Sequence, residues 1–307
     1  MKARIRNSHI GGLYFSKEQF ESSERTMRKT WADFRSSIAK GEFKYDDTES
    51  AIGTVFFKTF DQWFQEIGKV EMAKSLPECF EGRLSGRGSI IRDNEPKETP
   101  NYDRLMPKSE FIKEDNRFSP PGIEWLYLAI ADSEEKIKTC AEKECRAEEN
   151  NRFAFCKFKP NSAFNNLRIV DLTVGNDLSY DSINNRFRVL EKKLINQGKK
   201  YIQANGILAY EQNSEEIEKE IKQETVRWCL LTYAKMMSEN LFVPIETDDK
   251  KLEYAPFQAL AVYFIKQGFD GIVFSSTVYP KSKNIVLFDK NYAVPYGDVL
   301  DYIVSNI

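Results

Sequence analysis

Few residue types in this chain could do chemistry. The sequence holds a single histidine, His9, and five cysteines, none of which forms a Cys-x-x-Cys pair. It therefore lacks the ligands of a common zinc site and the base of a Ser-His or Cys-His nucleophile. Catalysis would depend on glutamate, arginine, serine and tyrosine, which can stabilise a developing cation and bind phosphate groups. We expect no metal.

One carboxylate falls on an apolar stripe. In EEKIKTCAEKECR, residues 134 to 146, the residues Ile137, Cys140 and Ala141 recur at helical spacing, and Glu144 continues the series. Glu144 is thus predicted to point inward, whereas Glu142 and Lys143 lie off the stripe and are expected to face solvent. An inward carboxylate is either paired in a structural ion pair or used at a site.

Two loops carry further candidates. Arg117 precedes a Pro-Pro-Gly turn in NRFSPPGIEWLYLA, which would hold the arginine beside the strand that contains Tyr127. Ser275 and Ser276 end the apolar run FDGIVFSS. Both loops also have a purely structural interpretation, as a rigid turn with an arginine and as serines that satisfy turn amides.

The elements that would position these residues fall into two parts. Residues 17 to 75 show aromatic residues at three- and four-residue steps, which predicts helices with a packing face. From about residue 78 the pattern is mixed, with strands at 125–131, 152–159 and 167–173 and a mostly helical stretch at 182–240. A helix over 256–268 and a hairpin of 269–276 with 284–289 complete the chain. We therefore expect an α+β fold, with a helical N-terminal extension (1–77) and a catalytic domain (78–307).

Composition narrows the class of protein. Lys and Arg (45) nearly balance Asp and Glu (47), so no global basic field favours nucleic acid as a direct partner. No segment approaches the ~20 consecutive apolar residues of a membrane span. An odd number of cysteines and the absence of a signal-peptide pattern argue against a disulfide framework and for a cytoplasmic location.

The order of the motifs resembles the RES family, which is named for its Arg, Glu and Ser. NRFSPPGIEWLYLA is similar to the family's Arg-Phe turn and Leu-Tyr-Leu-Ala strand, EKECR to its Glu-x-Arg, and LRIVDLT to the strand that follows. APFQALAVYFIKQGFDGIVFSSTVYPKSKNIVLFD is similar over its whole length. The resemblance covers about residues 80 to 290.

The resemblance assigns the family's functional residues to this sequence position by position. Ser276 lies five residues after Gly271 and matches the family serine, and Arg117, Tyr127 and Glu144 match within their motifs. Glu142 stays an alternative, because the tyrosine-to-glutamate spacing is longer than usual. For the first arginine GRGSII favours Arg87, with Arg83 and Arg92 as alternatives.

The resemblance implies a fold like that of ADP-ribosyltransferases, with two small sheets around a cleft that binds NAD as substrate. Glu144 would hydrogen-bond the ribose and stabilise an oxocarbenium-like cation, while Arg87 and Arg117 would bind the pyrophosphate. Tyr127 would stack on nicotinamide, and Ser276 would orient ribose or carboxamide without acting as a nucleophile.

The implied function is an NAD-degrading toxin, a glycohydrolase or phosphorylase that uses water or inorganic phosphate and is neutralised by an Xre-type antitoxin. Two alternatives stay open. One is mono-ADP-ribosylation of a protein, a transferase reaction in the same cleft. The other is a non-enzymatic interaction module built on a degenerate RES-like scaffold.

Overall fold

The computed structural model describes residues 16–42, 48–92, 99–205, 214–241 and 250–305. His9 lies outside them. The helices are α1 (Lys17–Ala39), α2 (Thr48–Gly53), α3 (Val55–Trp63), α4 (Lys69–Glu71), α5 (Leu76–Phe80), α6 (Tyr102–Leu105), α7 (Glu134–Glu144), α8 (Tyr180–Asn205), α10 (Ser214–Leu241) and α11 (Lys250–Lys266). The strands are β1 (Ala73–Ser75), β2 (Leu84–Ile91), β3 (Leu126–Ala131), β4 (Arg152–Pro160), β5 (Arg168–Asp171), β6 (Gly271–Ser275), β7 (Lys283–Leu287) and β8 (Ala293–Ile303). Short helical turns are η1 (Phe64–Gly68), η2 (Ser109–Phe111), η3 (Leu172–Gly175) and η4 (Lys290–Tyr292).

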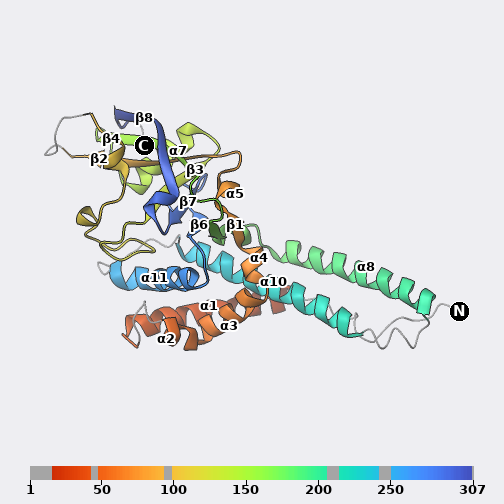
Figure 1. Ribbon diagram of the computed structural model, residues 1–307. Helices are drawn as coiled ribbons and strands as arrows, with labels where there is room; N and C mark the ends of the chain where they lie inside the picture. The colour runs from red at the N-terminus through yellow and green to blue at the C-terminus, as the bar shows by residue number, and fades with distance from the viewer. Residues whose placement is uncertain (1–15, 43–47, 93–98, 206–213, 242–249, 306–307) are drawn as a thin grey trace.

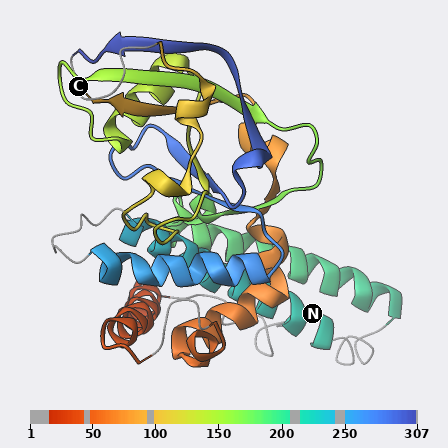
Figure 2. The ribbon, with the colours of Figure 1, turned by 60° about the vertical axis from the view of Figure 1, so that its left-hand side comes forward.

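A sheet lies above a layer of helices (Figures 1 and 2). The expected α+β class is confirmed, and so are the strands and helices predicted around the motifs. Gly268, at φ +78°, follows the end of α11, where glycine adopts the left-handed conformation without a Cβ penalty. β6 and β7 form the predicted antiparallel hairpin.

The expectation of two small sheets is wrong, because the strands of both halves belong to one sheet. Eight strands form one sheet in the order β1-β5-β6-β7-β3-β2-β4-β8. The physical reason is that β2 pairs with both β3 and β4, which joins the two halves. The β2–β3 pairing covers only Leu84 to Gly86, whereas β2 stays paired with β4 as far as Ile91. Beyond Gly86 the halves therefore diverge.

The sheet curls around an apolar interior. One hydrophobic cluster takes residues from β3, β6 and β7 in one half and from β4 in the other, which requires the two halves to face each other. Helix α7 covers β2, β3 and β4 from the outside through a second cluster. This packing fixes α7, which carries Glu144, against the point where the sheet divides.

The aromatic stripe of the N-terminal helices is a packing face, as the spacing predicted. Phe34, Phe56 and Phe60 are buried in a cluster that also contains residues of α10 and α11 and one face of β5–β7. The helices of residues 17–71 thus share a hydrophobic core with elements from the C-terminal half. The division at residue 77 stays a prediction.

Two glycines let β4 pack tightly against β2. A Cβ at Gly86 would lie 2.4 Å from the ring of Phe155, and one at Gly88 would lie 2.1 Å from the ring of Phe153. Because side chains alternate along a strand, Arg87 projects from the opposite face. The Gly-Arg-Gly sequence therefore combines close packing on one face with a single long cation on the other.

We predict that Gly88→Ala destabilises the protein by ~1–3 kcal/mol, because the new methyl group must displace the Phe153 ring in a packed core. Chemical denaturation would measure the free energy of unfolding. Gly53→Ala is the matched control, since no atom lies within 4 Å of a Cβ at that helical position. Equal stability of the Gly88→Ala and wild-type chains would contradict this account of β2.

Candidate active site

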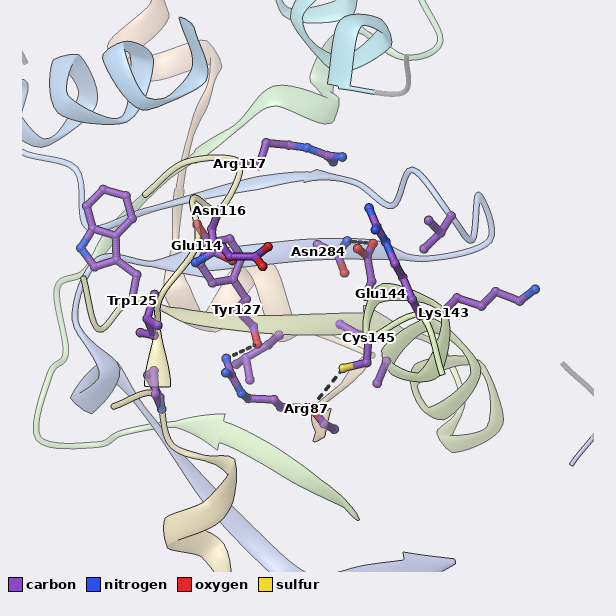
Figure 3. Close-up of a pocket in the computed structure, with 18 of the residues that line it drawn as sticks. Arg87, Glu114, Asn116, Arg117, Trp125, Tyr127, Lys143, Glu144, Cys145 and Asn284 are labelled. Atoms are coloured by element: carbon purple, nitrogen blue, oxygen red, sulfur yellow. Dashed lines mark hydrogen bonds between the residues drawn. The ribbon is translucent and has the colours of Figure 1, made fainter. Parts of the chain in front are cut away.

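A cavity of about 970 Å³ opens where β2 and β3 diverge. Its walls come from β2, β3, the end of α7, the segment 107–117 that precedes β3, and Tyr254 of α11. Phe274, Thr277, Val278 and Asn284, from β6, β7 and the loop between them, complete the lining. The volume lies near the upper end of the ~300–1,000 Å³ range of small-molecule sites. Figure 3 shows Glu144 and Asn284 together on one side, Tyr127 and Trp125 on the other, with Arg117 above and Arg87 below.

Arg87 lies at the fork of the sheet. Its Nη1 donates a hydrogen bond to the backbone oxygen of Tyr127 at 3.3 Å, across the gap where the β2–β3 ladder has ended. Burial lowers the pKa of this guanidinium, although arginine stays charged in proteins. No carboxylate of the described chain forms a salt bridge with it. Arg87 is therefore a cation whose remaining N–H donors form no salt bridge with a described carboxylate.

Arg117 enters the cavity from a loop that is held at both ends. The ring of Phe118 is fully buried and lies 5.0 Å from that of Phe274 on β6. The amide of Gln258 on α11 donates to the backbone oxygen of Asn116 at 3.1 Å. Arg117 Nη2 donates to Thr277 Oγ1 at 3.3 Å. Burial lowers the pKa of Arg117, and the nearby Glu144 acts in the opposite direction.

Glu144 ends the predicted stripe, but it is not buried among apolar side chains. Ile137, Cys140 and Ala141 are buried as predicted, whereas Glu144 is an exposed residue that lines the cavity. The helix ends at this residue. Its Oε1 accepts hydrogen bonds from Ser276 Oγ at 2.8 Å and from Asn284 Nδ2. Among the residues that the structure describes, none donates to Oε2.

Ser276 does not line the cavity, although the resemblance would have it orient ribose or carboxamide there. It is fully buried. Its Oγ accepts from the backbone N–H of Tyr279 at 3.0 Å, which directs the hydroxyl proton toward Glu144. Ser275 instead accepts from Asn176 Nδ2 at 2.7 Å. The two serines therefore have different partners, and a hydrogen bond to Glu144 links Ser276 to the cavity.

Tyr127 lines the cavity beside Arg87. Its hydroxyl is hydrogen-bonded to Ser119 Oγ at 3.0 Å, and burial raises the pKa of the phenol to about 12. The phenol is therefore neutral near pH 7. Its ring is fixed at both ends, by β3 and by this hydrogen bond.

The structure shows where each of the alternative residues lies. Glu142 lies outside the cavity wall and accepts a hydrogen bond from Tyr302 on β8 at 2.6 Å. Contrary to the prediction, it therefore does not face open solvent. Lys143, also expected to face solvent, lines the cavity. Arg83 is exposed and outside the cavity wall, whereas Arg87 and Arg92 both line the cavity. Of the three arginines, Arg87 lies at the fork of the sheet.

Asn284 and Trp125 were not among the site residues predicted from sequence, although both line the cavity. Asn284 directly precedes the apolar residues of β7. A polar residue in a central strand was the feature of the sequence that could have identified it as a site residue. Trp125 packs against Phe288, with ring centroids 4.6 Å apart.

The comparison with known families matches the C-terminal part of the chain. Residues 225–304 match the RES domain. The match spans about a quarter of the chain, at its C-terminal end. The matched segment includes Tyr254, Ser276 and Asn284, whereas Arg87, Arg117, Tyr127 and Glu144 lie before it in the sequence. No curated protein and no solved structure matches the chain.

Two further observations concern the part of the chain that the structure describes. No three His, Cys, Asp or Glu side chains gather as a metal site would require. No described helix combines the length and the apolar character needed to cross a bilayer.

Cys145 is a cavity-lining thiol, and its protonation gives a testable pH dependence. Burial raises the pKa of Cys145 to about 11, so the thiol stays protonated at neutral pH and reacts poorly with electrophiles. Alkylation of Cys145 by iodoacetamide, followed by mass spectrometry, should be slow at pH 7.5 and should accelerate as the pH rises toward 11. The denatured chain, with ordinary thiols, is the control. Rapid labelling of the folded protein at pH 7.5 would contradict this assignment.

Proposed function

We propose that the protein cleaves the nicotinamide–ribose bond of NAD. The observation that carries the proposal is that two arginines and one carboxylate line the same cavity, in a chain that matches the RES domain. The arginines form no salt bridge with described residues, and the carboxylate is held by hydrogen bonds. RES domains are associated with NAD-degrading toxins of toxin–antitoxin systems.

The cations of the cavity favour a phosphate-bearing ligand. Arg87 and Arg117 project into the cavity with donors that no described carboxylate occupies. A half-buried cation without a counter-ion is costly, and a pyrophosphate supplies both the charge and the acceptors. Aromatic rings of Tyr127 and Trp125 on the same wall offer flat surfaces for the bases of a dinucleotide.

The carboxylate of Glu144 suits the chemistry of the bond. Cleavage places positive charge on the ribose, in an oxocarbenium-like transition state. Because both hydrogen bonds from the protein go to Oε1, Oε2 is left to accept from ribose hydroxyls and to stabilise that charge. Nicotinamide leaves as a neutral molecule, so the leaving group requires no general acid.

The remaining choice concerns the acceptor. Water would give ADP-ribose, inorganic phosphate would give a phosphorylated ADP-ribose, and a protein side chain would give ADP-ribosylated protein. An antitoxin that covers the cavity would complete a toxin–antitoxin pair. Incubating the purified chain with NAD, with and without phosphate, and identifying the products by mass spectrometry tests the function and distinguishes these acceptors.

We expect Glu144→Gln to lower the rate of nicotinamide release at least ~100-fold, because the neutral amide no longer stabilises the ribose cation. Glu142→Gln is the matched control, since it makes the same change two residues away, at a carboxylate that bonds Tyr302. Full activity of the control with loss in Glu144→Gln supports the proposal. An active Glu144→Gln chain would contradict it.

We expect Arg87→Ala and Arg117→Ala each to weaken NAD binding ~10-fold or more, since a charge-assisted hydrogen bond contributes ~1.5–3 kcal/mol. Calorimetric titration of NAD into chains that also carry Glu144→Gln would measure affinity without turnover. Arg83→Ala is the control, because Arg83 lies outside the cavity wall. Unchanged affinity in both variants would remove the arginines from the binding site.

A further inference from the structure

We propose that Asn284 is a positioning residue that holds the Glu144 carboxylate in the orientation needed to engage the ribose. This inference rests on the function proposed above. It goes beyond that function, because it makes the activity of Glu144 depend on an amide in the central strand β7.

The contacts between Asn284 and Glu144 define one rotation of the carboxylate. Asn284 Nδ2 and Ser276 Oγ donate to the same oxygen, Oε1. Two donors on one oxygen restrict the rotation of the carboxylate, and no described residue donates to Oε2. With Ser276 alone, the carboxylate could turn about that single hydrogen bond.

Asn284 is itself held rigidly. It lies in β7, where its backbone pairs with Ala129 of β3 on one side and Phe274 of β6 on the other. It is 6% exposed. Asparagine is unfavourable in strands, and a buried amide must have partners. An apolar residue would suit the strand better, so the amide is explained by its partner Glu144.

The orientation of the amide is set from behind by Cys140. The thiol of Cys140 donates to Asn284 Oδ1 at 3.6 Å, and Ser282 Oγ lies 2.8 Å from the sulfur. Burial raises the pKa of Cys140 to about 11, so the thiol keeps its proton near pH 7. With Oδ1 occupied by this donor, Nδ2 must face Glu144. A flipped amide would instead place an oxygen against the carboxylate.

The first test replaces the amide. Asn284→Ala removes the donor, and Asn284→Asp keeps the shape but places an acceptor against Oε1. We expect both to lower kcat for nicotinamide release ~10–100-fold with KM within about threefold of wild type, since the carboxylate acts mainly in the transition state. A loss confined to KM, or unchanged kinetics in both variants, would overturn the inference.

A double-mutant cycle distinguishes positioning from a structural role. If Asn284 acts through Glu144, adding Asn284→Ala to Glu144→Gln should change the residual rate by less than about twofold. A structural role would lower the rate by the same factor in both backgrounds, and that result would overturn the proposal.

Cys140 gives a test that leaves the cavity wall intact. Cys140→Ala removes the donor to Oδ1 and should lower kcat about threefold to tenfold, whereas Cys140→Ser keeps a donor and should restore most of the loss. Cys156→Ala, at an equally buried cysteine on β4, is the matched control. Equal activity of Cys140→Ala and wild type would show that the thiol does not orient the amide.

Failure of the proposed function is distinguishable from failure of this inference. A wild-type chain that releases no nicotinamide contradicts the function. Crystal structures of the wild-type and Asn284→Ala chains then still test the inference. A Glu144 carboxylate that turns away from its wild-type position in the variant supports it, and an unmoved carboxylate overturns it.

Discussion

The structure depends on a pairing that stops early. β2 and β3 are hydrogen-bonded over only three residue pairs and then separate, while β2 continues along β4. The separation leaves backbone groups of β3 without a strand partner, and Arg87 supplies a hydrogen bond to one of them at Tyr127. A sheet paired along its full length would place strands where the cavity now opens. The cavity thus results from an interrupted ladder.

The helical layer has a direct effect on that cavity. Its buried aromatic residues pack α1 and α3 against α10 and α11, and α11 in turn holds the loop that carries Arg117, through Gln258 and Asn116. Phe118 ties the same loop to β6. The N-terminal helices therefore support one wall of the site through packing, although none of their residues lines the cavity.

The electrostatics of the site follow from which charges have partners. Glu144 is held by neutral donors, so its charge is oriented without being neutralised. Arg117 contacts a hydroxyl and Arg87 a backbone oxygen, and neither forms a salt bridge with a described residue. Opposite charges facing one cavity without direct neutralisation leave both available to a ligand that carries phosphates and develops a cation.

The sequence by itself determined the local structure and the family resemblance. Helical spacing placed Ile137, Cys140 and Ala141 on one buried face, alternation and turn residues located the strands, and the motif around Gly271 led to the RES family. These features depend on neighbours within a few residues, which a sequence displays directly.

Only the tertiary structure determined the surroundings of residues at the ends of helices and strands. Glu144 opens to the cavity because α7 ends there, Ser276 is buried because its loop folds back onto Tyr279, and Asn284 meets Glu144 across 140 positions of the chain. Hydrogen bonds over such separations depend on how strands and helices pack, and periodicity carries no information about them.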